Sequence, residues 1–159
     1  ARRAGLSSTG LISYHFAGKS ELMAQVAQEV YGELGQHMAA RMAGAQGPAA
    51  ALEAYLRGIT EFIAAHRKQM KAVLEIFLNG GIQYTPGTEL VVLSPVEEIL
   101  RAGQSAGEFR QFDVRIMAAV IQRAIDGLPF LLETHPDIDL GLYADELVTT
   151  FTLATRREP

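Results

Sequence analysis

The chain contains 159 residues, of which 48% are hydrophobic and 20% charged, and it has no cysteine. This length suits one domain with a real core. The lack of cysteine excludes disulfide scaffolds, zinc fingers, iron–sulfur sites and thiol nucleophiles. Because the charges are scattered, no apolar run approaches the roughly 18 residues that a membrane span needs. No secretion signal opens the chain, so the sequence predicts a cytoplasmic globular protein.

The charge is distributed unevenly along the chain. Residues 1–20 contain three cations, Arg2, Arg3 and Lys19, and no acid, so the net charge of −4 leaves −7 for the remainder. A basic end on an acidic body indicates a polyanionic partner at that end. An ordinary solvated surface would also give three cations in 20 residues.

In chain order, the pattern predicts helices only. Gly5 suits a tight turn, and either Ser7 or Ser8 can cap a two-turn helix over 9–16. Apolar residues spaced by three and four predict the other helices. Their expected ranges are 20–44, 48–66, 70–78, 94–105, 113–133 and 139–155. Because no strand pattern alternates over a useful length, the predicted fold class is all-α, with about seven helices.

Particular residues set the expected helix ends. Ser94 followed by Pro95 has the form of a helix start, which leaves residues 80–93 as a loop. Pro129 falls inside the apolar stripe of 113–133, where it is expected to kink the helix.

The last predicted helix has two candidate caps. Asp137 and Asp139 both lie just before its apolar stripe begins. Either carboxylate can accept from a free backbone N–H in the first turn.

The helix over 9–16 has the composition of a DNA recognition helix. Small hydroxyl residues near its start let the helix end approach base edges in the major groove, where they can donate or accept. Tyrosine, histidine and lysine further along can reach phosphates. The predicted DNA contacts are Ser8, Thr9, Gly10, Ser13, Tyr14, His15 and Lys19.

Three blocks in this region, Ala4–Ser7, Gly10–Phe16 and Lys19–Leu22, occur in a characteristic order. They resemble the second half of the DNA-binding domain of TetR/AcrR-family transcriptional regulators. The turn is one residue longer than the commonest family form, and the family's helix one and most of helix two have no counterpart. The resemblance therefore implies a partial helix-turn-helix headpiece over 1–19 and a helical-bundle effector-binding and dimerisation domain over 20–159.

The resemblance also implies a function. It implies a ligand-responsive regulator, a repressor that a small apolar or amphipathic effector releases from a pseudo-palindromic double-stranded DNA operator. The effector site is expected among the middle helices, although the same residues suit ordinary core packing. Its expected lining is Phe62, His66, Met70, Leu74, Phe77, Ile121, Gln122 and Ile125.

A homodimer is the second structural expectation from the resemblance. The last two predicted helices are expected to pair with their copies in a two-fold four-helix interface, with internal packing as the alternative. The expected interface residues are Val120, Ala124, Gly127, Leu128, Leu131, Tyr143, Leu147 and Phe151.

Other kinds of chemistry find little support in the sequence. The four histidines show no metal-ligand spacing, and no nucleophile elbow, dinucleotide fingerprint or phosphate-binding loop occurs. The sequence therefore predicts no enzyme, metal or cofactor. The alternative function is a dimeric helical module that binds a ligand or a protein but not DNA.

Overall fold

The computed structural model describes residues 18–80, 83 and 85–157, and these residues form seven helices. The helices are α2 (Lys19–Met42), α3 (Pro48–Ala65), α4 (Arg67–Leu78), α5 (Pro86–Ser105), α6 (Val114–Asp126), α7 (Leu128–Thr134) and α8 (Leu140–Thr155). The described part has no strand beyond one isolated bridge between Phe109 and Arg156. The predicted all-α class is confirmed. None of the described helices has the length and apolar character that crossing a bilayer requires.

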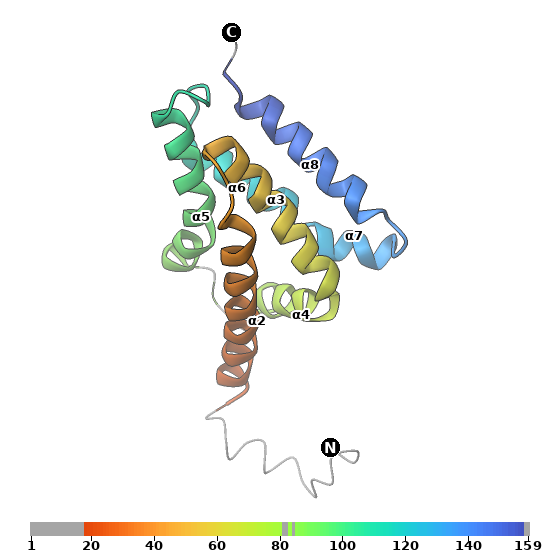
Figure 1. The fold of residues 1–159 in the computed structure, drawn as a ribbon. Helices are drawn as coiled ribbons and strands as arrows, with labels where there is room; N and C mark the ends of the chain where they lie inside the picture. The colour runs from red at the N-terminus through yellow and green to blue at the C-terminus, as the bar shows by residue number, and fades with distance from the viewer. Residues whose placement is uncertain (1–17, 81–82, 84, 158–159) are drawn as a thin grey trace, which may run out of the picture.

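Helix α3 lies between α2 and α8 (Figure 1) and contacts α2, α5 and α8. It begins at Pro48, as predicted, because proline's fixed backbone angle and missing N–H suit a first helical turn. Its buried side chains recur at spacings of three and four within the expected range 48–66 and include Leu52, Tyr55, Leu56, Ile59, Phe62 and Ile63.

Helix α2 packs on this core from Ala27 to Met42, while its N-terminal end lies at the opposite end of the molecule from the end of α8 (Figure 1). Its Ala27 and Val30 are buried, and Leu34, Met38 and Met42 are partly buried against the same cluster. From Val30 to Met42 these apolar side chains step by four residues, as one face of a helix requires.

The start of α5 corrects the sequence prediction. The helix begins at Pro86, so most of residues 80–93 are helical and Pro95 lies inside the helix. The cap is Thr85, whose Oγ1 accepts from the backbone N–H of Thr88 at 3.2 Å. Pro95 cannot donate to the carbonyl of Val91, and the Ser94 hydroxyl donates to that carbonyl instead, at 3.4 Å.

The predicted helix over 113–133 is also corrected, because it is divided into α6 and α7 at Gly127. Pro129 lies in the first turn of α7, where the missing N–H removes no bond that α7 itself needs. The prediction of Asp139 as a cap is confirmed, since its Oδ1 accepts from the N–H of Leu142 at 3.0 Å. That cap sets the start of α8.

Candidate functional site

The predicted DNA-contacting residues fall almost entirely outside the part of the chain that the structure describes. Ser8, Thr9, Gly10, Ser13, Tyr14 and His15 lie outside the described residues. Lys19 is the first residue of α2. The position of α2 therefore sets where the preceding segment joins the bundle.

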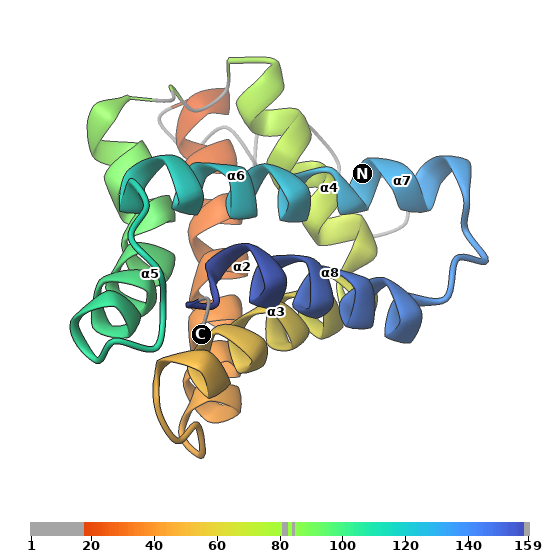
Figure 2. The same cartoon turned by 90° about the horizontal axis from the view of Figure 1, so that it is seen from above.

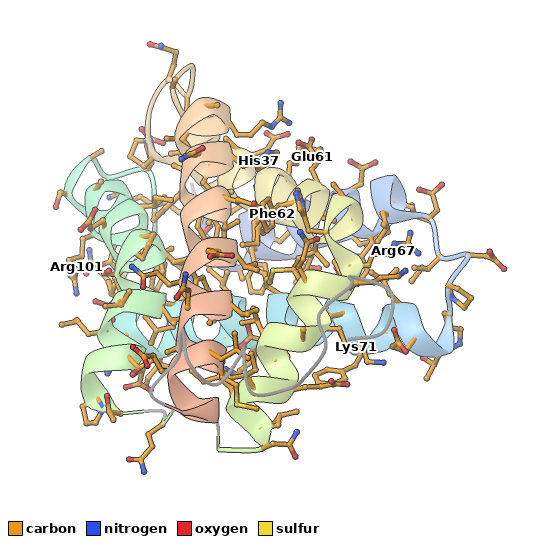
Figure 3. All side chains as sticks on the ribbon, turned by 90° about the horizontal axis from the view of Figure 1, so that it is seen from below. His37, Glu61, Phe62, Arg67, Lys71 and Arg101 are labelled. Atoms are coloured by element: carbon orange, nitrogen blue, oxygen red, sulfur yellow. The ribbon has the colours of Figure 1, made fainter. Side chains whose placement is uncertain are left out.

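The C-terminal half of α2 is held against α3 by polar contacts around one aromatic ring (Figure 3). His37 Nε2 donates to the carbonyl of Gly58 at 3.0 Å, since a carbonyl can only accept. Arg41 Nη2 pairs with Glu61 Oε1 at 2.6 Å. The ring of Phe62 lies 5.7 Å from the ring of His37, centroid to centroid. These contacts tie α2 to the centre of the core.

The two helices approach closely at Gly58. A Cβ atom placed there would lie 3.1 Å from Met38 Sδ and 3.3 Å from the Cβ of Arg41. Two helix turns further along α3, at its C-terminal end, His66 stacks on Phe62 with a centroid distance of 4.1 Å, and its Nδ1 donates to the Phe62 carbonyl at 3.0 Å. The glycine thus brings α2 within reach of the histidine and carboxylate contacts.

Most of the predicted effector-site residues converge in the core. Helices α3, α4 and α6 contribute Phe62, Met70, Ile121 and Ile125 to one hydrophobic cluster, with Phe77 packed against it. Leu74 and His66 are partly buried, and Gln122 is a buried polar side chain.

Neither of two surface hollows among the described residues is lined by any of the eight predicted effector-site residues. One, of about 380 Å³, lies over residues 134–138 between α7 and α8. The other, of about 170 Å³, lies between α3 and α8 and is lined by Arg57, Thr60 and Glu61 among others.

A polar pair on α6, Gln122 and Asp126, lies near Tyr55 of α3. Gln122 Nε2 donates to Asp126 Oδ1 at 2.7 Å. Burial raises the pKa of Asp126, against the opposing effects of its hydrogen bond from Gln122 and of nearby Arg123. Burial, reinforced by the charge of Asp126, raises the pKa of Tyr55 to about 12. The carboxylate of Asp126 therefore gives this part of the protein, beside the apolar core, a negative electrostatic potential.

A buried acid lies between α5 and α6. Glu97 is only 2% exposed and pairs with Arg101 on its own helix. Arg115 of α6 lies 3.6 Å from the other carboxylate oxygen and also pairs with Glu89. Sequence reasoning missed Glu97, although it follows Leu93 by four residues within an apolar stripe, and this spacing is the signal that could have revealed it.

The predicted dimer residues divide into three groups. Val120 and Gly127 are exposed, and Ala124, Leu131, Tyr143 and Leu147 are partly buried. Leu128 and Phe151 are buried in the core of the same chain. The Tyr143 hydroxyl donates to the carbonyl of Ala124 at 3.0 Å, which joins α8 to α6 within one chain.

Large apolar side chains are nonetheless exposed on α6, α7 and α8. Helices α6 and α7 follow one another in line, and α8 runs beside them in the opposite direction (Figure 2). Five side chains on them, between 41% and 65% exposed, are Ile116, Val120, Phe130, Leu142 and Leu153. All but Val120 were absent from the sequence prediction. We call this set of five exposed apolar side chains the outer seam.

Comparisons with known proteins bear on the fold. No protein-family model matches the sequence, and no curated protein matches it. The structure is similar to that of a bacterial regulatory protein in the tetR family from Rhodococcus RHA1, with a TM-score of 0.77 and 16% sequence identity. The match covers 96% of this chain and 82% of the other. The chain therefore has the fold of a TetR-family regulatory protein.

Proposed function

We propose that this chain is a ligand-responsive, DNA-binding transcriptional regulator, a repressor that a small effector releases from its operator. The observation that carries the proposal is an agreement between two independent features. The helical bundle is similar to that of a tetR-family regulatory protein, and the sequence before the bundle, from Ala4 to Leu22, resembles the recognition half of that family's headpiece. In this proposal residues 1–19 belong to the headpiece and residues 20–159 form the effector-binding and dimerisation domain.

The outer seam supports a homodimer as the working form. Ile116 and Val120 are four residues apart and so lie on one face of α6, and α8 adds Leu142 and Leu153 to the exposed apolar surface. Burial of these side chains against a second copy removes apolar surface from water on both subunits. A two-fold dimer places two recognition helices in successive major grooves of a pseudo-palindromic operator.

Helix α2 is the element that we propose to couple effector to operator. It begins at Lys19, directly after the segment that resembles the recognition helix, and its other half is tied to Phe62 and Gly58 of α3. An effector that binds the core better in a second arrangement of these helices changes the separation of the two headpieces. Such a shift cannot exceed the effector's difference in affinity for the two arrangements.

A gel shift of the protein against the DNA upstream of its own gene tests the proposal. Lys19→Ala should weaken binding to all sequences and lower the slope of log affinity against log salt by about 0.9 for each phosphate that the variant no longer neutralises. Lys68→Ala, at an exposed position on α4, is the matched control and should leave both unchanged. Thr9→Ala should alter discrimination at particular bases. Operator binding that neither headpiece variant alters, or no binding at all, favours the alternative of a helical binding module without a role at DNA.

A further inference from the structure

The side chain of Gln122 presents an unpartnered acceptor inside the bundle. Gln122 is 8% exposed, and its Nε2 donates to Asp126 Oδ1. Because an ionised carboxylate only accepts, this contact fixes the orientation of the amide with its nitrogen toward Asp126. The amide Oε1 therefore points away from Asp126, and among the described residues it has no hydrogen-bond partner although it is buried. Such an acceptor is costly to leave unbonded in a core.

Beside Gln122, the negatively charged group is less exposed than the positively charged group with which it pairs. Arg123, which pairs with Asp126, has a side chain that is 59% exposed, whereas that of Asp126 is 28% exposed. The negative field of Asp126 extends into the core, since it contributes to the raised pKa of Tyr55. The interior side of the Gln122–Asp126 pair therefore favours a positive charge.

A second unpartnered acceptor, on Glu97 of α5, lies beside α6 two turns before Gln122. Arg115 precedes Gln122 by seven residues, which places the two on one face of the helix, about 10 Å apart along its axis. At Arg115 the buried carboxylate of Glu97 has an Oε1 atom without a hydrogen-bond partner among the described residues, with Arg115 Nη1 at 3.6 Å. The cation of this second pair is again the more exposed member, at 52% for the Arg115 side chain against 3% for Glu97. Unpartnered acceptors thus lie at two successive levels along α6, one on α6 itself and one on the neighbouring α5.

We propose that the effector is a small amphipathic amine, whose protonated nitrogen donates to Gln122 Oε1 and Asp126 while its apolar body packs among α3, α4 and α6. The inference rests on the proposed ligand-responsive function and specifies its ligand. An ammonium group has three donors and no acceptor, so it supplies what both oxygens accept. A carboxylate would bring more acceptors to the same place and would be repelled by Asp126.

Binding at Gln122 also requires a rearrangement of the core. Gln122 lines neither of the two hollows described above. Since Gln122 is buried, we infer that an amine reaches it when the helices packed around α6 move apart. The effector therefore binds the opened arrangement better than the closed one, which is the difference in affinity that a ligand-driven shift needs.

Three probes with one eight-carbon tail test the inference: octylammonium, octan-1-ol and octanoate. Each is titrated calorimetrically into the full chain at pH 7, without DNA. Octylammonium should bind at least about tenfold more tightly than octanoate, a difference of about 1.4 kcal/mol, with octan-1-ol between them. Gln122→Met keeps a similar volume without the acceptor, and Asp126→Asn removes the charge. Each should reduce the preference to within about threefold.

Two exposed positions provide matched controls, Gln69→Met on α4 and Asp137→Asn before α8, and both should keep the full preference. The inference is overturned if none of the probes binds, if octanoate binds as tightly as octylammonium, or if the preference survives in Gln122→Met and Asp126→Asn. The last result would mean attraction of a cation to an acidic surface. Circular dichroism checks that each variant folds, and Asp126→Asn decides alone if Gln122→Met does not fold. Because these titrations contain no DNA, they can fail while the operator gel shift succeeds, and the reverse.

Discussion

Among the described glycines, Gly103 on α5 is the position where a single methyl group should disturb the fold most sharply. A Cβ atom there would lie 2.0 Å from Cδ2 and 2.3 Å from Cε2 of Phe109, distances that real Cβ atoms essentially never show. The Phe109 ring is buried, and its backbone N–H donates to the Gly103 carbonyl at 3.0 Å. The next residue, Arg110, donates its N–H to the carbonyl of Thr155 at 2.9 Å. Phe109 is therefore held between α5 and the end of α8 and cannot simply move aside.

The magnitude for Gly103→Ala follows from two opposing effects. Alanine favours a helix over glycine by up to about 1 kcal/mol. Overpacking a core costs about 1–3 kcal/mol, and a 2.0 Å contact with a ring calls for the upper end or beyond. The expected net loss in the free energy of unfolding is about 2–3 kcal/mol. In a chain of this size it corresponds to a Tm lower by about 4–12 °C.

Thermal and urea unfolding followed by circular dichroism measure this effect. Gly32→Ala is the matched control, because Gly32 lies inside α2 and an added Cβ would meet nothing within 4 Å. The control should gain about 0.5–1 kcal/mol from helix propensity alone. If Gly103→Ala proved as stable as Gly32→Ala, the packing of Phe109 on Gly103 would be wrong.

Three further substitutions test the proposed dimer, the cap of α8 and the partly buried carboxyl of Asp126. Val120→Arg on the outer seam should convert the dimer to monomers in analytical ultracentrifugation, because two-fold symmetry introduces the change on both subunits, whereas Val91→Arg at a 73% exposed position of α5 should not. A dimer that persists in Val120→Arg excludes that face. Asp139→Ala should lower the free energy of unfolding by about 1 kcal/mol in urea titrations, and an equal loss in Asp137→Ala would contradict the capping role. Because burial raises the pKa of Asp126, the folded state holds its proton more tightly than the unfolded state, so the stability from this group is present at low pH and falls as pH rises through that pKa. Asp126→Asn should therefore be more stable than the wild type at pH 7, and the difference should shrink as pH approaches 3.8, the ordinary value for the carboxyl; a difference that grows on acidification would refute the sign.

The sequence by itself predicted those features that depend on residues close together in the chain. The stripe from Leu52 to Ile63, the proline start of α3 and the Asp139 cap all involve contacts within a few helical turns. Such contacts depend on local geometry, and the 3.6-residue period expresses them directly. The all-α class and the resemblance of the N-terminal blocks come from the same kind of information.

The tertiary structure decided which signals apply and which faces are covered. Ser94–Pro95 and Thr85–Pro86 both have the form of a helix start, and only the second is one, because the Ser94 hydroxyl bonds the carbonyl that Pro95 leaves free. The buried side of α6 was equally undetermined, since an apolar stripe does not state what will cover it. Packing within the bundle placed Leu128 inside the chain and left Ile116 exposed. Gln122 and Glu97 are buried because neighbouring helices cover them. Burial is a property of the assembled bundle, so no single segment of the sequence could have predicted it.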